Sequence, residues 1–301
     1  MLKLPIHPRL ARFMLAAAEF GMVPDAALAA ALLTERDPFS VPSEAVAAAH
    51  TCDVSDKVER LRAFFDGRPI RAIEPGRAKQ IRAVADQLQR CMEQGSTIQR
   101  GSSQHDARSR ASGNHPLARV LLAAYPDRVA RRREPSGDRG LMVGGRGVRL
   151  DRRSRVRGGE LFLCVDVDAS GSEAIVRSAC VIEPQWLDER LIRVVDEYSL
   201  DQDRGSVIAR RRRYFDDLLL SEQPIPCQPG ERVAELLAAA ARADLSQTFP
   251  SDMQEVSGFI GRARFISDAM PELDLPSLDD ACLDQVLVTL CQTRTTLSQV
   301  R

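Results

Sequence analysis

The chain has 301 residues, a formal net charge of zero and 44% apolar residues, enough for two or three domains with separate cores. No apolar run approaches the roughly 18–20 residues that a membrane-spanning helix needs, so we expect no membrane protein. The N-terminus shows no continuous apolar core with a small-residue cleavage site, so no secretory signal is expected. Seven widely spaced cysteines without a CxxC pair indicate a reducing cytoplasm, with neither disulfides nor zinc.

Apolar residues repeat at helical spacing over residues 1–92, which predicts a helical domain. His7 precedes a proline at a helix start, where a capping role fits better than catalysis. Ser55 is a candidate N-cap for a later helix, and a further helix begins near Pro75. Residues 93–114 hold one Ile and no aromatic residue. Such a segment buries too little apolar area to offset its ordering entropy, so we expect a disordered loop there.

The stretch from Arg128 to Arg157 carries eleven arginines and three acidic residues, a local excess of +8 in a neutral chain. Apolar residues alternate with these arginines between Gly- and Pro-bearing turns, which predicts short β-strands with a basic exposed face. Further strands are predicted over residues 159–167 and 174–182, and a hairpin is predicted around residues 203–205.

Helical patterning returns after residue 229, where Phe259, Ile260, Ala263 and Ile266 form one apolar stripe. Residues 244–284 hold nine acids against two arginines, a local charge of −7. The predicted fold class is α+β. It comprises a helical domain (1–92), a disordered loop (93–114), a short helix and a β-domain (115–228), and a C-terminal helical region (229–301).

Motifs for nucleotide hydrolysis, calcium binding and nucleophilic catalysis are absent from the sequence. The glycines of residues 144–147 are not followed by the Lys-Ser/Thr of a phosphate loop, so they predict a hairpin turn. An EF-hand starting at Asp166 needs a Glu at its twelfth position, where Arg177 stands. The four histidines show no metal-ligand spacing. We therefore expect no catalytic residue, metal or cofactor in this chain.

Consecutive arginines are the remaining signal. Surface arginines suit phosphate, because each contact displaces counterions and makes binding salt-dependent. A run such as residues 210–213 cannot lie inside a two-sided core, because alternate strand side chains face opposite sides. Composition alone leaves open a solvated face, or one that contacts another domain such as the acidic tail. The candidate nucleic-acid contacts are Arg131, Arg132, Arg133, Arg146, Arg149, Arg210, Arg211 and Arg212.

Several short motifs occur in the order found in one helicase family. Residues 4–12 (LPIHPRLAR) resemble the segment that opens a helical ratchet domain in HrpB-type, DEAH-box ATP-dependent RNA helicases. Ile182 with residues 184–187 (PQWL) resembles the segment closing the OB-type barrel of related helicases. Further matches are LTERDP (33–38), AYPDRVARRR (124–133), GRG (145–147), ARRRR (209–213) and LLLSEQPIP (218–226). The family's RecA-like motor domains and its C-terminal aromatic- and basic-rich stretch have no counterpart in this sequence.

The resemblance implies the accessory part of such a helicase, with a ratchet-like domain, an OB-like β-domain and a shortened C-terminal helical region. It implies binding or guiding of single-stranded RNA in the cytoplasm for a motor absent from this chain. ATP and magnesium belong to that motor, so this chain alone is expected to be inactive. Aromatic residues are scarce at 5%, so backbone contacts should dominate. The alternatives are a protein-interaction module that docks on a RecA-like motor, in cis or in trans, and a non-functional gene fragment.

Overall fold

The structure, a computed structural model, describes residues 6–40, 51–96, 116–248, 253–273 and 279–300. The chain forms two compact units, of which the first comprises residues 1–192 and 215–218 and the second comprises residues 193–214 and 219–301. Each unit combines helices with a sheet, and the predicted α+β class is confirmed. Within the described ranges, no helix has the length and apolar character needed to cross a membrane.

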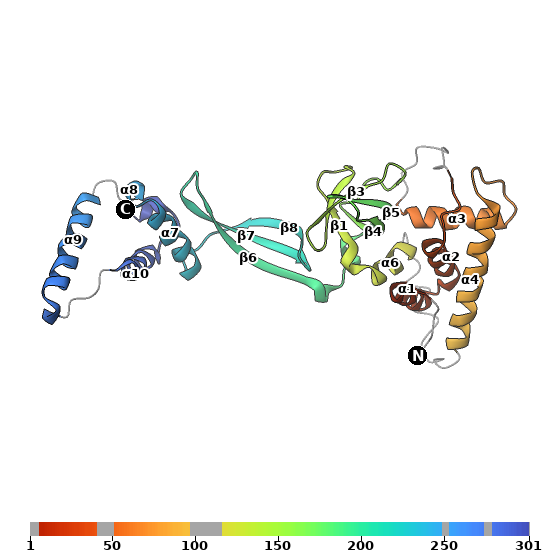
Figure 1. Cartoon of the computed structure of the whole chain (residues 1–301), viewed down its shortest axis with the longest axis horizontal. Helices are drawn as coiled ribbons and strands as arrows, with labels where there is room; N and C mark the ends of the chain where they lie inside the picture. The colour runs from red at the N-terminus through yellow and green to blue at the C-terminus, as the bar shows by residue number, and fades with distance from the viewer. Residues whose placement is uncertain (1–5, 41–50, 97–115, 249–252, 274–278, 301) are drawn as a thin grey trace. The chain divides into compact units, whose positions relative to one another are not determined.

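The first unit begins with helices that pack on one another (Figure 1). α1 contacts α2 and α6, and α2 lies against α3 and α4. α2 buries residues on all of its faces because residues 26–33 are all Ala or Leu. The helices are α1 (Pro8–Glu19), α2 (Val23–Thr34), α3 (Asp53–Phe65), α4 (Pro75–Ser96) and α6 (Pro116–Ala124). Most of the predicted disordered loop (93–114) lies outside the described residues, and its first four residues continue α4.

Two predicted helix starts have different outcomes. His7 is the N-cap of α1, and its Nδ1 accepts a hydrogen bond from the Arg9 backbone N–H at 3.3 Å, which confirms the predicted capping role. The prediction that Ser55 caps α3 is wrong, because α3 already begins at Asp53 and Cys52 is its N-cap. The Asp53 carboxylate accepts hydrogen bonds from the β-domain instead of capping its own helix.

Five strands of the first unit close into a barrel in the order β1-β2-β3-β5-β4. The pairs are antiparallel except for β3 with β5, which is parallel. Phe162, Val148 and Val176 are fully buried in its core. The strands predicted in and after the basic stretch are thus confirmed. They are β1 (Val129–Arg132), β2 (Arg139–Met142), β3 (Arg146–Leu150), β4 (Leu161–Asp168) and β5 (Ala174–Ile182).

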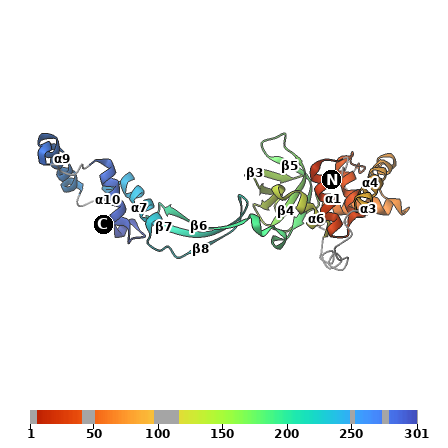
Figure 2. The same cartoon turned by 90° about the horizontal axis from the view of Figure 1, so that it is seen from below.

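Helices α3 and α6 join the helical layer to the barrel, since α6 contacts β4 and β5 while α3 contacts β5 (Figures 1 and 2). A disulfide between Cys52 and Cys180 links the start of α3 to β5. The backbone N–H of Val181 donates to the Thr51 carbonyl at 2.6 Å beside it. The expectation of no disulfide is therefore wrong for this pair. The two cysteines lie 128 residues apart, and only the packing of α3 on the barrel brings them together.

The second unit contains a three-stranded sheet in the order β6-β7-β8 and the C-terminal helices. The predicted hairpin is confirmed, with its turn at residues 202–205 between β6 and β7. Although the predicted β-domain extends to residue 228, these three strands lie outside the closed barrel. The elements are β6 (Ile192–Asp201), β7 (Ser206–Phe215), β8 (Leu218–Ile225), α7 (Glu231–Ala243), α8 (Leu245–Thr248), α9 (Met253–Ala269) and α10 (Asp280–Cys291). Short 3-10 helices cover Pro126–Arg128, Pro184–Trp186, Glu189–Leu191, Pro271–Leu273 and Leu297–Gln299.

Candidate nucleic-acid interface

The outer face of β2 and β3 carries two arginines side by side. Arg139 and Arg149 are directly paired across these strands, and Arg149 is in turn paired with Ile175 of β5. The next pair in the ladder, Gly140 and Val148, lies on the core side of the sheet. The side chains of Arg139 and Arg149 therefore point outward. Like charges directly opposite each other destabilise a sheet. Arg139 has a counter-charge, the Glu173 carboxylate at 3.6 Å, while Arg149 is exposed and makes no ion pair with any residue that the structure describes.

The next outward positions on this face carry few bulky side chains. Leu141 of β2 is paired with Gly147 of β3 and with Arg131 of β1. The guanidinium of the exposed Arg133 lies beside Gly147, where a Cβ would stand 3.8 Å from its Nη2. Leu141 and Ile175 are each more than a third exposed. The outer face therefore combines exposed guanidinium groups with accessible backbone at Gly147 and with two exposed aliphatic side chains.

Arg132 differs from its neighbours because it points into the barrel. Only 6% of it is exposed, and its guanidinium donates to the carbonyls of Gly158, Gly159, Gly137 and Val156. Burial lowers the pKa of Arg132, and the nearby Arg157 lowers it further. This arginine closes the end of the barrel and presents no donor to a ligand on the outer face.

Arg131 and Arg146 lie at the surface but already have partners. Arg131 Nε donates to Glu160 at 2.8 Å. Arg146 donates to the carbonyls of Ala169 and Gly171 at 2.7 and 3.4 Å, which holds the turn between β4 and β5 against β3. Both remain partly exposed. They contribute positive potential to the face, but a phosphate would have to share their guanidinium groups.

The second run of arginines, on β7, pairs with acids of its neighbouring strands. Arg211 makes two hydrogen bonds of 2.7 and 2.8 Å to Asp196 of β6. Arg210 pairs with Glu222 of β8 at 2.9 Å, and Arg212 pairs with Glu222 at 3.1 Å and with Glu197 at 2.6 Å. None of the three is buried, which agrees with the prediction that such a run cannot lie in a two-sided core. Their charges are largely balanced within the sheet.

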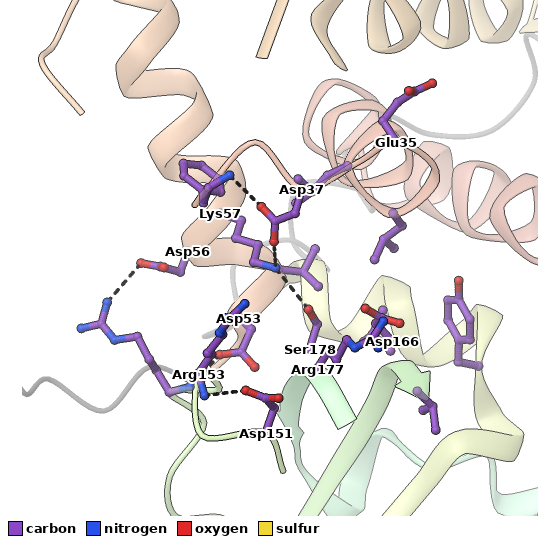
Figure 3. A pocket seen from close by; sticks show the side chains of 18 of the residues that line it. Glu35, Asp37, Asp53, Asp56, Lys57, Asp151, Arg153, Asp166, Arg177 and Ser178 are labelled. Atoms are coloured by element: carbon purple, nitrogen blue, oxygen red, sulfur yellow. Dashed lines mark hydrogen bonds and ion pairs between the residues drawn. The ribbon is translucent and has the colours of Figure 1, made fainter. Parts of the chain in front are cut away.

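A charged cleft of about 900 Å³ separates the helical layer from the barrel in the first unit (Figure 3). Lys57 of α3 crosses it, donating to Asp37 at 2.8 Å and to Ser178 of β5 at 3.4 Å. Asp56 on the same helix faces Arg155 at 3.8 Å. Cations and carboxylates line the cleft in similar numbers. The cleft is therefore lined by ion pairs and hydrogen bonds between the helical layer and the barrel. It does not present a surface of one charge.

Asp53 is a buried residue at the contact between α3 and the barrel. Its carboxylate accepts hydrogen bonds from Ser154 Oγ at 2.7 Å, from the Arg155 N–H at 2.9 Å and from the Ala179 N–H at 2.9 Å. The residue is 7% exposed. Burial raises the pKa of Asp53, although the hydrogen bonds from Arg155, Ala179 and Ser154 act to lower it. A single buried carboxylate thus ties the first turn of α3 to two segments of the barrel.

Comparison with known families identifies the helical layer. Residues 7–72 match the model of a family described as "Helicase associated domain (HA2), ratchet-like". Residues 7–72, which include α1, α2 and α3, are similar to a helicase-associated domain. The resemblance drawn from the sequence motifs is therefore confirmed for this part of the chain. Asp53 and Lys57, which join the helices to the barrel, both lie within the matched residues.

Two solved structures extend the comparison beyond the helicase-associated domain. The crystal structure of the E. coli DExH-box NTPase HrpB matches 98% of this chain, with 20% sequence identity and a TM-score of 0.46. The crystal structure of the Escherichia coli DEAH/RHA helicase HrpB also matches 98% of it, with 18% identity and a TM-score of 0.47. Each match covers 34% of the HrpB chain, so this chain spans about a third of that length. A search of the curated proteins gives no match.

Two informative residues are missing from the sequence-based candidates. Arg139 lies in the predicted basic stretch, and its position became significant only when the strand register placed it against Arg149. Asp53 resembles an ordinary acid in the first turn of a helix, and its partners are about 100 or more residues away. No three His, Cys, Asp or Glu side chains gather into a metal site among the residues that the structure describes.

Proposed function

We propose that this chain is an accessory part of an ATP-dependent RNA helicase and binds or guides single-stranded RNA on the outer face of β2 and β3. The strand order 1-2-3-5-4 with a parallel β3–β5 pair supports an OB-type assignment for the barrel. OB-type barrels bind oligonucleotides on the face of strands 2 and 3 and on the β1–β2 and β4–β5 loops. Arg133 lies in the first of these loops and Glu173 in the second.

The observation that carries this proposal is the direct pairing of Arg139 with Arg149. Two guanidinium groups on opposite strands repel each other, and an anion between them would remove that cost. Phosphate groups of a nucleic acid supply such anions without requiring a particular base sequence. The outward positions of the same rows hold aliphatic side chains and no aromatic ring, so base stacking would add little.

ATP hydrolysis would come from a RecA-like motor outside this sequence, in cis or in trans. The helicase-associated domain would contact that motor, while the barrel face would hold the RNA. The competing hypothesis is a protein-interaction module that docks on this motor. Arg210, Arg211 and Arg212 have carboxylate partners within their own sheet, which makes them less available to phosphate.

A salt titration of RNA binding tests the proposal with two matched triple variants. Binding of a labelled single-stranded RNA is measured by fluorescence anisotropy between about 50 and 200 mM salt. Each lost phosphate contact should reduce the log–log slope by about 0.7. The variant with Arg133, Arg139 and Arg149 replaced by Ala should therefore lose about 2 units of slope. Replacing Arg210, Arg211 and Arg212 by Ala removes the same charge and should change the slope by less than about 1 unit.

The opposite result for the two variants would move the RNA site to the β7 sheet. No binding by the unmodified chain at the lowest salt would reject the RNA-binding function altogether. In that case a chain that still co-purifies with a RecA-like motor would support the interaction module.

A further inference from the structure

The disulfide between Cys52 and Cys180 lies at the contact between α3 and the barrel. Residues 51–53, which we call the docked segment, lie along β5. Cys52 forms an antiparallel β-bridge with Cys180, and the Val181 N–H donates to the Thr51 carbonyl. The pairing of β3 on β5 runs to Val176. The docked segment therefore continues the pairing of that edge of β5 beyond the end of β3.

The disulfide also joins two walls of the charged cleft. Asp53 and Lys57 of α3 line the cleft on one side, and Ser178 of β5 lines it on the other (Figure 3). Asp53 directly follows Cys52 in the sequence. Ser178 stands two positions before Cys180. A covalent bond at this point limits how far α3 can move from β5, and therefore how far the cleft can widen.

The other five cysteines of the chain are free thiols, and Cys91, Cys227 and Cys282 are partly exposed. Free thiols of this kind fit a reducing compartment, because exposed thiols pair or oxidise in an oxidising one. Disulfides that form beside free thiols in a reducing compartment are usually transient or redox-sensing. The distribution of cysteines therefore favours a reversible bond over a permanent cross-link.

Non-covalent contacts hold the docked segment as well. The Asp53 carboxylate accepts hydrogen bonds from Ser154 Oγ, from the Arg155 N–H and from the Ala179 N–H. Without the disulfide the segment can still bind to β5, but its binding becomes an equilibrium. Cys52 is 2% exposed and the other sulfur is fully buried. A reductant therefore reaches the bond only while the contacts of Asp53 are open.

We propose that the Cys52–Cys180 pair is a redox switch at the junction of the helices and the barrel. The oxidised pair holds α3 on β5, and the reduced pair allows α3 to move away so that the cleft widens. The switch is independent of RNA binding by the outer face of β2 and β3, because the docked segment contacts β5 and the β3–β4 loop instead.

The reductant is a dithiol, and the exchange takes place in two steps. A thiolate of the dithiol attacks Sγ of Cys180 and forms a mixed disulfide, while Cys52 leaves as a thiolate, which the positive N-terminus of α3 favours. The second thiol of the dithiol then attacks the sulfur of its own molecule in the mixed disulfide and releases Cys180. Both protein thiolates take up protons. Two electrons have then passed to the protein, and the dithiol has become a disulfide.

The rate of reduction of the full chain tests how the bond is covered. The oxidised protein is treated with dithiothreitol, and the thiols that appear are alkylated and counted by mass spectrometry. Asp53→Asn weakens the contacts of the docked segment, so its bond should be reduced about tenfold faster, as the loss of one buried hydrogen bond implies. Asp66→Ala, at the other end of α3, is the matched control and should change the rate by less than about twofold.

Amide hydrogen exchange measured by NMR follows the docked segment itself. The N–H groups of Ala179 and Val181 both donate to this segment. Their exchange should become about tenfold faster or more on reduction, and it should return to its first rate after oxidised glutathione restores the bond. The Val143 N–H, which donates to a carbonyl within the barrel, should change by less than about twofold. In Cys180→Ser both amides should exchange at the fast rate with or without dithiothreitol.

Each of four results would exclude the switch. Seven thiols in the denatured protein even after treatment with oxidised glutathione would mean that no bond forms. Loss of the helical circular dichroism signal on reduction would make the bond a structural cross-link. Unchanged exchange of Ala179 and Val181 on reduction would mean that the bond does not control the docked segment. Equal reduction rates for Asp53→Asn and the unmodified chain would mean that the contacts of Asp53 do not cover the sulfurs.

Discussion

Replacement of Asp53 tests whether a buried carboxylate holds the helicase-associated domain on the barrel. Asp53→Ala removes three hydrogen bonds, from Ser154 Oγ, the Arg155 N–H and the Ala179 N–H. The Ser154 hydroxyl can rotate toward another acceptor, but the two backbone N–H groups cannot. Each polar group left without a partner in a buried site costs about 1–3 kcal/mol. The free energy of unfolding should therefore fall by about 2–6 kcal/mol.

Asp53→Asn provides an intermediate case. Its amide keeps one oxygen, which can still accept from one of the two backbone donors, and it places an NH₂ group against the other. We expect about half the loss, or about 1–3 kcal/mol. Asp66→Ala is the control, because Asp66 is exposed at the other end of α3. It should change stability by no more than about 0.5 kcal/mol.

Urea denaturation followed by tryptophan fluorescence measures these differences in the relevant unit. Trp186 is the only tryptophan, and it lies in the first unit together with Asp53. The reasoning is refuted if Asp53→Ala unfolds within about 0.5 kcal/mol of the unmodified chain. It is also refuted if Asp53→Asn is as damaging as Asp53→Ala, since the loss would then not follow the number of hydrogen bonds.

Two further predictions concern the barrel and its disulfide. A Cβ on Gly140 would stand 2.8 Å from the Arg131 carbonyl oxygen and 2.9 Å from Phe162 Cζ. Gly140→Ala should therefore lower stability in a circular dichroism melt by about 1–3 kcal/mol, and Gly147→Ala in β3, where a Cβ would meet only Arg133 Nη2 at an ordinary 3.8 Å, should not. An effect of equal size in the two variants would contradict the steric explanation. The purified, denatured protein should show five reactive thiols before reduction and seven after it, and seven before reduction would exclude the Cys52–Cys180 bond. Loss of the bond in a Cys52→Ser, Cys180→Ser variant should cost about 4–5 kcal/mol, because the bond closes a loop of 128 residues.

The sequence was sufficient for features that depend on neighbouring residues. The strand over residues 174–182 was predicted at the bounds that the structure gives, and a short helix was predicted before the β-domain, where α6 lies. The His7 cap and the hairpin turn near residue 203 were also predicted. In each case the signal is local, because periodicity, a proline or a turn residue stands within a few positions of the feature. The motif order that resembled helicase accessory regions was sequence information of the same kind.

Arg132 is an intermediate case. Alternation along a strand sends every second side chain to the opposite face, so Arg131 and Arg132, the two arginines of β1, had to point to opposite sides. The sequence therefore predicts the alternation of these two side chains. Only the positions of Ala130 and Phe162 inside the barrel show that Arg132 is the one that faces the core.

Tertiary structure alone decided the features that join distant segments. Barrel closure pairs β1 with β4 and β3 with β5, which sets Arg149 beside Ile175, whereas the register of the neighbouring strands β2 and β3 sets Arg139 beside Arg149. Packing of α3 on β5 brings Cys52 to Cys180 and Asp53 to the Ala179 N–H. The two contacts of α3 cross 128 and 126 residues of chain, and no local preference encodes them. They form because burying the apolar faces of α3, α6 and the strands in one core fixes where every other side chain must lie.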